Sequence, residues 1–195
     1  MKTVLTVAGS DPSGGAGIQA DIKTITAHGL YATSAITALT VQNTLGVSRV
    51  EPVPVDLVVQ QIDCVVGDIR PDAVKIGMLC NAEIVQAVAQ ALAHGQAECI
   101  VIDPVMISTS GHRLLDQEAV QWMKRKLFPM AQLITPNLPE AEALCGMRVR
   151  DEAEMERAAR LLSDQTGAAV LLKGGHLAKT ACLLYTSPSP RDRSL

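Results

Sequence analysis

The sequence contains few aromatic residues and no concentrated basic segment. One Trp, two Tyr and one Phe occur among 195 residues, and the formal net charge is −3. Proteins that bind nucleic acid need basic surface and rings that stack on bases. We therefore expect no nucleic-acid partner. An anionic nucleotide remains compatible with this composition, because it needs only a few local cations.

Cysteines are also few and show no pairing pattern. The five are scattered, and no two stand in Cys-x-x-Cys spacing. An odd, scattered set indicates neither a zinc site nor a disulfide framework. No apolar run is long enough to cross a membrane, and the run near the N-terminus breaks at residues 9–11, too early for a signal peptide. We expect a cytoplasmic protein with no membrane partner.

A glycine-rich turn is the most distinctive local feature. The segment Gly9–Gly17 reads GSDPSGGAG and follows an apolar run, Val4–Ala8, that is typical of a buried strand. Ile18, Ile22 and Ile25 then recur with helical spacing. A glycine turn between a strand and a helix N-terminus is typical of small-molecule sites. It matches neither the dinucleotide fingerprint nor the phosphate loop, so a tight turn without a ligand stays open.

Strand-like and helical segments alternate along the rest of the chain, and 48% of the residues are apolar. This alternation predicts an α/β fold with a parallel sheet covered by helices on both faces. The expected strands are Val4–Ala8, Thr33–Val41, Ala73–Ile76, Cys99–Ile102, Leu133–Thr135 and Ala168–Leu172.

Polar side chains follow these strands where each one ends. They are Ser10, Gln42, Asp103, Asn137 and Lys173. Carboxyl ends of parallel strands meet at one edge of a sheet, which is where open α/β sheets bind ligands. We therefore expect these groups to share a site. Ordinary alternatives remain for some of them, since Asn137 and Glu140 suit a helix cap and Lys173 suits a solvated surface.

Asp21 is the further polar residue of interest. It lies three residues after Ile18 and four before Ile25, on or beside the apolar face of the first helix. A carboxylate there either has a partner or reaches water at the edge of the stripe. Both interpretations stay open from the residues alone.

Six segments, in order, resemble the hydroxymethylpyrimidine/phosphomethylpyrimidine kinases of thiamine biosynthesis. They are Ala8–Asp21 (AGSDPSGGAGIQAD), Ile36–Thr44 (ITALTVQNT), Lys75–Leu79 (KIGML), Asp103–Met106 (DPVM), Ile134–Ala141 (ITPNLPEA) and Leu172–His176 (LKGGH). The resemblance covers about residues 3 to 177. Six ordered segments are far more specific than any one of them.

The resemblance implies a ribokinase-like fold, a three-layer αβα arrangement around a mostly parallel sheet, over residues 1–180. It also implies an enzyme that transfers the γ-phosphoryl group of ATP with Mg²⁺. The expected acceptors are 4-amino-5-hydroxymethyl-2-methylpyrimidine and then its monophosphate. Relatives of this kind are commonly homodimers.

The resemblance also assigns site residues by position. Those expected to bind the pyrimidine are Gln42, Asp21, Gly9, Met78 and Val105. Those expected to bind the nucleotide are Asp103, Asn137 and Lys173, and those expected to hold the metal are Glu140 and Asp103. The glycine turn is thereby placed toward the pyrimidine, in contrast to the triphosphate site that its local pattern first suggests.

The C-terminal region departs from the family pattern. The family's Gly-Thr-Gly-Cys element, which carries the catalytic cysteine and an anion hole, is absent from this sequence. We therefore assign no catalytic residue, and Cys182 is not its counterpart because no Gly-Thr-Gly precedes it. Residues 181–195, rich in Ser, Pro and Arg, are expected to be a non-family tail, disordered or artefactual. The chain as written is expected to show little or no turnover.

Two other functions remain compatible with the residues. A pyridoxine or pyridoxal kinase of the same superfamily acts on a similar ring alcohol. A non-catalytic, truncated ligand-binding fragment is the alternative from another class, and the missing C-terminal element favours it for the chain as written.

Overall fold

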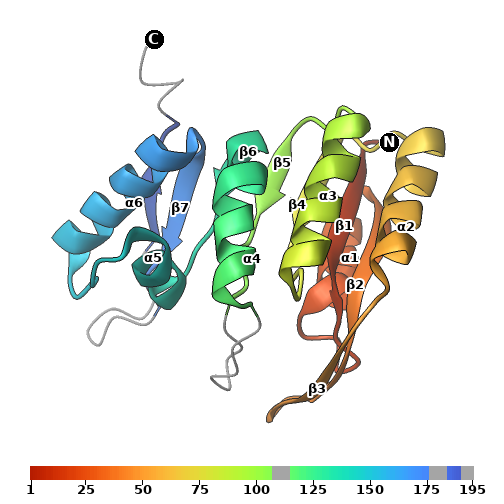
Figure 1. The fold of residues 1–195 in the computed structure, drawn as a ribbon, viewed down its shortest axis with the longest axis horizontal. Coiled ribbons are helices and arrows are strands. Elements are labelled where there is room, and N and C mark those ends of the chain that lie inside the picture. Colours follow the sequence, from red (N-terminus) through yellow and green to blue (C-terminus); the bar gives the residue numbers. More distant parts are fainter. Residues whose placement is uncertain (107–114, 176–183, 190–195) are drawn as a thin grey trace.

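A computed structural model describes residues 1–106, 115–175 and 184–189 of the chain. Within these ranges, eight strands form a single sheet (Figure 1). They are β1 (Thr3–Ser10), β2 (Tyr31–Asn43), β3 (Gly46–Pro52), β4 (Ala73–Ile76), β5 (Ile100–Ile102), β6 (Ala131–Ile134), β7 (Ala169–Lys173) and β8 (Leu184–Ser187).

The strand order across the sheet is β3-β2-β1-β4-β5-β6-β7-β8. Neighbouring strands from β2 to β7 pair in parallel, whereas β3 and β8 pair antiparallel at the two edges. Central strands such as Ile100–Ile102 are short and apolar because both faces of a parallel sheet are covered. The predicted mostly parallel α/β sheet is confirmed.

Helices cover the sheet on both faces (Figure 1). They are α1 (Gly17–Ala27), α2 (Val55–Asp68), α3 (Ala82–His94), α4 (Gln117–Trp122), α5 (Leu138–Cys145) and α6 (Glu152–Thr166), and a π-helical turn (Met123–Leu127) and a 3₁₀ turn (Phe128–Met130) continue α4. Helices α2, α3 and α4 pack side by side on one face, whereas α1 packs on β1 and β2. From β1 the chain crosses to β2 on one side, whereas from β4 to β7 it moves across the sheet in the other direction. Because both kinds of crossover are right-handed, α1 lies on the opposite face of the sheet from α2, α3 and α4.

Local capping signals define several helix starts. The side chains of Asn81, Asp116 and Asp151 each accept a hydrogen bond from the backbone N–H three residues later. These bonds satisfy N–H groups that lack a partner inside the helix. They fix where α3, α4 and α6 begin, and Asn and Asp are among the residue types favoured at this position.

The main core lies between the sheet and the layer of α2, α3, α4 and α6. Its largest fully buried side chains include Ile62, Ile76, Ile84, Leu92, Ile102, Phe128 and Ile134. Burying one such side chain contributes about 1.5–3 kcal/mol. The core holds the strands in register, so the loops at their carboxyl ends start from fixed positions.

The structure differs from the sequence expectation at the β2–β3 hairpin. We expected a strand over Thr33–Val41 followed by a polar loop, but β2 runs to Asn43 and returns as β3. The Asn43 side chain accepts the N–H groups of Leu45 and Gly46 and closes the turn. The hairpin carries Gln42 on a strand projecting from the body of the sheet (Figure 1), where we had expected a loop.

The second difference concerns residues 181–195, which we expected to lie outside the fold. Leu184–Ser187 instead pairs with β7 as edge strand β8. The Ser163 hydroxyl donates to the Pro188 carbonyl, and the Ser189 hydroxyl donates to the Gly167 carbonyl. Pairing with an open sheet edge orders a segment that has no periodicity of its own. The domain boundary after residue 180 stays a prediction, and His176 and Cys182 lie outside the described residues.

Candidate active site

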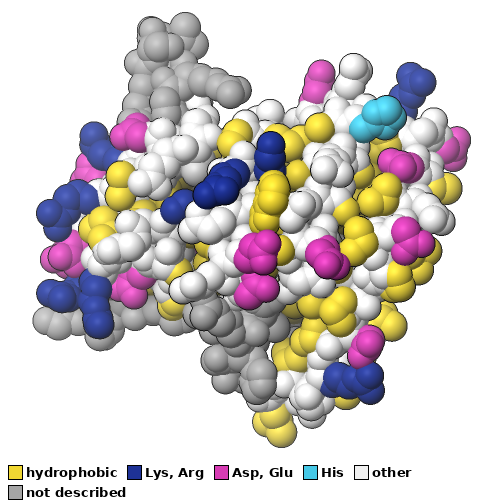
Figure 2. All heavy atoms as spheres, viewed as in Figure 1, with side chains coloured by type: hydrophobic (Ala, Val, Ile, Leu, Met, Phe, Trp, Pro, Cys, Tyr) yellow, Lys and Arg dark blue, Asp and Glu magenta, His cyan; other side chains and the backbone are white. Residues whose placement is uncertain are grey.

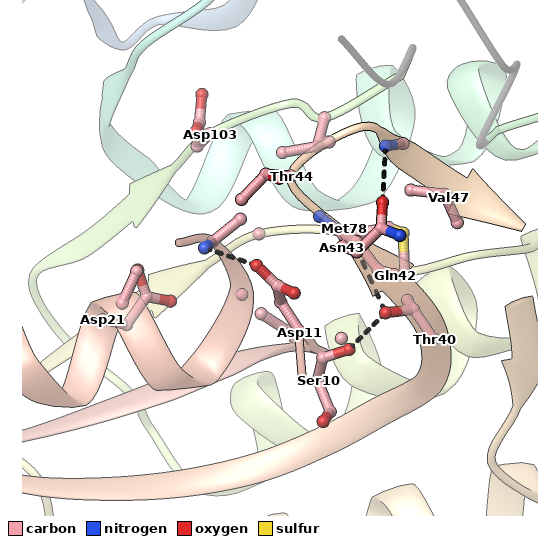
Figure 3. Close-up of a pocket in the computed structure, with 18 of the residues that line it drawn as sticks. Ser10, Asp11, Asp21, Thr40, Gln42, Asn43, Thr44, Val47, Met78 and Asp103 are labelled. Atoms are coloured by element: carbon pink, nitrogen blue, oxygen red, sulfur yellow. Dashed lines mark hydrogen bonds between the residues drawn. The ribbon is translucent and has the colours of Figure 1, made fainter. Parts of the chain in front are cut away.

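A cleft of about 690 Å³ opens at the carboxyl ends of the central strands. From β1 the chain continues to β2 on one side, and from β4 it continues to β5 on the other. Loops that leave two adjacent strands in opposite directions leave a crevice between them. The cleft is lined by residues that follow β1, β4, β5 and β6, by α1, and by the β2–β3 hairpin (Figure 3).

The glycine turn is closed by its own carboxylate. Asp11, which is 2% exposed, accepts the backbone N–H groups of Ser13, Gly15 and Ala16 at 2.8–3.0 Å. Burial alone would raise the pKa of Asp11, but the hydrogen bonds from the Ser13 side chain and these N–H groups lower it overall. The N–H groups that the local pattern offered to a phosphate are therefore already occupied within the chain.

Two glycines allow close approach at the floor of the cleft. A Cβ on Gly9 would lie 2.5 Å from the Met78 methyl carbon, so this side chain packs directly on the backbone of β1. Gly17 has φ +56°, and a Cβ there would lie 2.3 Å from the Gly9 carbonyl oxygen. The turn thus folds back onto the end of β1 and brings α1 against the cleft.

Gln42 is oriented by neighbours on the hairpin. The Thr40 hydroxyl donates to the Ser10 carbonyl at 2.8 Å and lies 3.2 Å from Gln42 Oε1. Figure 3 shows Gln42, Thr40 and Ser10 on one side of the cleft. A hydroxyl contact on Oε1 restricts the amide group, which can donate and accept toward a ring with matching edges.

Asp21 and Lys75 form an ion pair on the other side of the cleft. Lys75 Nζ donates to Asp21 Oδ2 at 2.8 Å, and the Thr6 hydroxyl donates to the same oxygen at 2.6 Å. The Asp21 and Lys75 side chains retain 17% and 27% exposure. The open question about Asp21 is resolved, because the carboxylate has two partners and still borders the cleft.

Asp103 and Lys173 form a second ion pair at the ends of β5 and β7. Lys173 Nζ donates to Asp103 Oδ1 at 2.8 Å, and the Thr135 hydroxyl lies 3.2 Å from the same oxygen. Lys173 therefore contacts a carboxylate at the strand edge. The alternative of a lysine surrounded only by water is not what the structure shows.

Asn137 and Glu140 form a reciprocal cap at the start of α5. The Asn137 side chain accepts the Glu140 N–H at 2.9 Å, and Glu140 Oε2 accepts the Asn137 N–H at 2.8 Å. The other Glu140 oxygen lies 3.3 Å from the Met106 N–H and so joins two strand-end loops. Burial raises the pKa of the Glu140 carboxyl, and the negative charge of Asp103 raises it further.

The structure brings most of the predicted site residues into one cleft. Eight of them line it: Gly9, Asp21, Gln42, Met78, Asp103, Val105, Asn137 and Glu140. The ninth, Lys173, contacts the cleft through Asp103. The roles of these residues toward ligands stay predictions.

Two cleft residues were not singled out from the sequence. Asp11 was read only as part of the glycine turn, and Lys75 only as part of the KIGML segment. A signal was present for Lys75, because a lysine inside the four-residue strand Ala73–Ile76 requires a partner. Among the described residues, no cluster of three or more His, Cys, Asp or Glu could hold a metal by itself, and no helix is long and apolar enough to span a membrane.

Comparison with known proteins gives the same family at the levels of sequence and structure. The sequence model of the family described as phosphomethylpyrimidine kinase matches residues 11–190. A hydroxymethylpyrimidine/phosphomethylpyrimidine kinase from Haemophilus influenzae is 49% identical over 176 residues, covering 90% of this chain and 65% of the relative. The chain thus spans less than two thirds of that relative's length.

Solved structures agree with this match. Phosphomethylpyrimidine kinase from Clostridium difficile 630 superposes with a TM-score of 0.87 at 42% identity, covering 97% of this chain and 85% of that one. A pyridoxal kinase from Staphylococcus aureus also gives 0.87, at 34% identity, covering 97% of this chain and 69% of that one. The expected ribokinase-like fold and the family resemblance are confirmed, and the chain belongs to the phosphomethylpyrimidine kinase family.

Proposed function

We propose that this chain forms the substrate-binding part of an ATP-dependent kinase that phosphorylates 4-amino-5-hydroxymethyl-2-methylpyrimidine and its monophosphate. One observation carries the proposal. Residues matched to the acceptor side and residues matched to the nucleotide side line a single cleft at the point where the strand connections diverge. Phosphoryl transfer depends on positioning two substrates and neutralising charge, which a shared cleft serves.

On the acceptor side, we assign the ring to the space bordered by Gln42, Gly9, Met78, Asp21 and Val105. The glycine at position 9 and the packed Met78 methyl group supply a flat apolar floor. Gln42 and Asp21 stand on opposite sides of the cleft in Figure 3 and offer hydrogen-bonding groups to the ring's edges. This combination suits an aminopyrimidine, which has apolar faces and a donor–acceptor edge.

On the nucleotide side, we assign Asp103, Asn137 and Lys173 to ATP, and Asp103 with Glu140 to Mg²⁺. Mg²⁺ is commonly held by one or two carboxylates together with phosphate oxygens and water. Two carboxylates at neighbouring strand ends fit that pattern. Burial raises the pKa of Glu140 and the negative charge of Asp103 raises it further, and a divalent cation would offset the second of these effects. The metal would neutralise phosphate charge, while Lys173 would orient the nucleotide.

Replacing Gln42 by alanine is expected to weaken binding of the pyrimidine alcohol about 5- to 150-fold. The substitution removes a hydrogen-bonding group whose ring partner is left desolvated, a loss of about 1–3 kcal/mol. Isothermal titration calorimetry with the full chain measures it without requiring turnover. Gln90→Ala, at an exposed position on α3, is the matched control and should bind as the wild type does.

Pyridoxal serves as the competing ligand in the same titration, because the similarity to a pyridoxal kinase favours that function as the second candidate. If pyridoxal binds more tightly than the pyrimidine, the pyridoxal kinase function replaces the pyrimidine kinase function as our proposal. Equal affinity of the wild type and Gln42→Ala would remove Gln42 from the site.

We further propose that the chain forms a homodimer through the outer face of the β2–β3 hairpin. Leu39 and Val41 are 54% and 58% exposed on β2, and Leu45 at the tip is 89% exposed. Figure 2 shows hydrophobic atoms exposed at the tip of the hairpin, at the lower edge of the view. Contiguous exposed apolar side chains of this kind mark interaction surfaces.

Val41→Lys is expected to raise the dimer dissociation constant at least about tenfold, because it places a charge in an apolar contact. Light scattering coupled to gel filtration gives the mass over a dilution series. Leu57→Lys, at a 47% exposed leucine on α2, is the control and should leave the mass unchanged. A wild-type chain that is monomeric throughout the series would reject the homodimer.

We assign the protein to the cytoplasm. The four cysteines within the described residues, Cys64, Cys80, Cys99 and Cys145, are free thiols. Burial raises the pKa of Cys80, and it raises that of Cys145 to about 11. Thiols of this kind suit a reducing compartment.

A further inference from the structure

The charged side chains that line the cleft are unequal in sign. Among the described residues, the lining contains four carboxylates, from Asp11, Asp21, Asp103 and Glu140, and one ammonium, from Lys75. Asp11 is committed to the N–H groups of the glycine turn. Of the other three, Asp103 is paired with Lys173 and Asp21 with Lys75, so the carboxylates still exceed the cations by one, at Glu140, beside any bound acceptor.

Lys75 is held in place at the edge of this cleft. It stands on β4 beside Thr6 of β1, and both side chains contact the same oxygen of Asp21. Gly77 lies beneath the ammonium group, since a Cβ there would lie 3.0 Å from Lys75 Nζ. The 27% exposure of the Lys75 side chain leaves this cation accessible to a ligand.

The two acceptors of the proposed function differ mainly in charge. The hydroxymethyl group of the alcohol is uncharged, whereas the phosphate group of the monophosphate carries a charge of about −1.5 to −2 at pH 7. Like charges in a partly enclosed cleft repel strongly, and a nearby cation reverses the effect. The alcohol can therefore bind without a cation, but the monophosphate needs one that the cleft itself supplies.

We propose that Lys75 is the specificity-determining residue for the monophosphate: its ammonium group donates to a phosphate oxygen of the acceptor while Asp21 and Thr6 keep it in position. This inference rests on the proposed function and names the residue that admits the second acceptor. Lys173 acts at the other end of the site, where it is paired with Asp103.

The test compares two ligands on the full chain by isothermal titration calorimetry: 4-amino-5-hydroxymethyl-2-methylpyrimidine and its monophosphate. Lys75→Met is expected to lower affinity for the monophosphate about 10- to 100-fold, the range of one charge-assisted hydrogen bond. Its affinity for the alcohol should change less than about threefold. Lys75→Arg, which keeps the charge, should restore most of the monophosphate affinity.

Lys23→Met is the matched control, because Lys23 contacts the Gly14 carbonyl on the exposed side of the same turn and does not line the cleft. It should leave both affinities unchanged. Equal losses for the two ligands in Lys75→Met would show a structural role only, and no loss for the monophosphate would also overturn the proposal. A wild-type chain that binds neither ligand would instead reject the pyrimidine function itself.

Discussion

Gly17→Ala is expected to lower the free energy of unfolding by about 2–5 kcal/mol and to abolish measurable ligand binding. The left-handed backbone at φ +56° costs an alanine about 1–2 kcal/mol. The added Cβ would also lie 2.3 Å from the Gly9 carbonyl oxygen and 3.1 Å from the Asp11 nitrogen. Relief requires movement of the turn away from β1, and forced repacking of this kind costs about 1–3 kcal/mol more.

Gly29→Ala separates the two contributions. Gly29 follows the same helix with φ +74°, and nothing lies within 4 Å of its added Cβ. Only the cost of the left-handed backbone remains, so we expect the free energy of unfolding to fall by about 1–2 kcal/mol and the cleft to stay intact. Urea unfolding followed by circular dichroism measures both variants. Equal losses in the two would mean that close approach at Gly17 contributes nothing.

Asp11→Ala is expected to cost about 2–3 kcal/mol of stability. It removes the acceptor of the Ser13, Gly15 and Ala16 N–H groups. Water must then satisfy these N–H groups in place of the carboxylate. Because the turn carries the start of α1, the loss also loosens Asp21 in the cleft. Asp11→Asn, which keeps one side-chain oxygen as an acceptor, should lose roughly half as much.

The contribution of Asp11 also has a defined pH dependence. The pKa of this carboxyl is lower in the folded chain than its ordinary value of 3.8. A lowered carboxyl pKa stabilises the fold above the ordinary value, and this stabilisation is lost as the pH falls through the folded-state pKa. The stability difference between wild type and Asp11→Asn should therefore be largest near neutral pH and shrink below pH 3.8.

Unfolding measured from about pH 7 to about pH 2.5 tests this relation. A difference that stays constant across the range would show that the ionised form of Asp11 has no preferential role in the turn.

Much of the architecture could be predicted from short stretches of sequence. Ala73–Ile76 was expected as a strand with the bounds observed, and the helix that follows begins after Asn81, a residue type that favours the N-cap. A strand and a helix cap of this kind depend on residues within a few positions of one another. The sequence pattern that predicts them and the contacts that form them therefore involve the same residues. The placement of polar groups after the strands followed from the rule that parallel strands share a carboxyl edge.

The hairpin and the edge strand could not be predicted in this way. The turn at Asn43 has no Asn-Gly or Asp-Gly pair, so its hairpin signal is weak. Leu184–Ser187 becomes a strand because β7 offers an open edge. Both elements owe their structure to pairing partners that local composition does not reveal.

By itself the sequence determined the order of strands and helices, the helix caps and the set of polar groups at the strand ends, since each depends on residues close together along the chain. Only the tertiary structure decided which charges pair. Lys75 meets Asp21 across 54 positions and Lys173 meets Asp103 across 70, and both contacts exist because the sheet order sets these elements side by side. It also decided that the N–H groups of the glycine turn bind the Asp11 carboxylate. Among the described residues that line the cleft, Lys75 carries the single ammonium group.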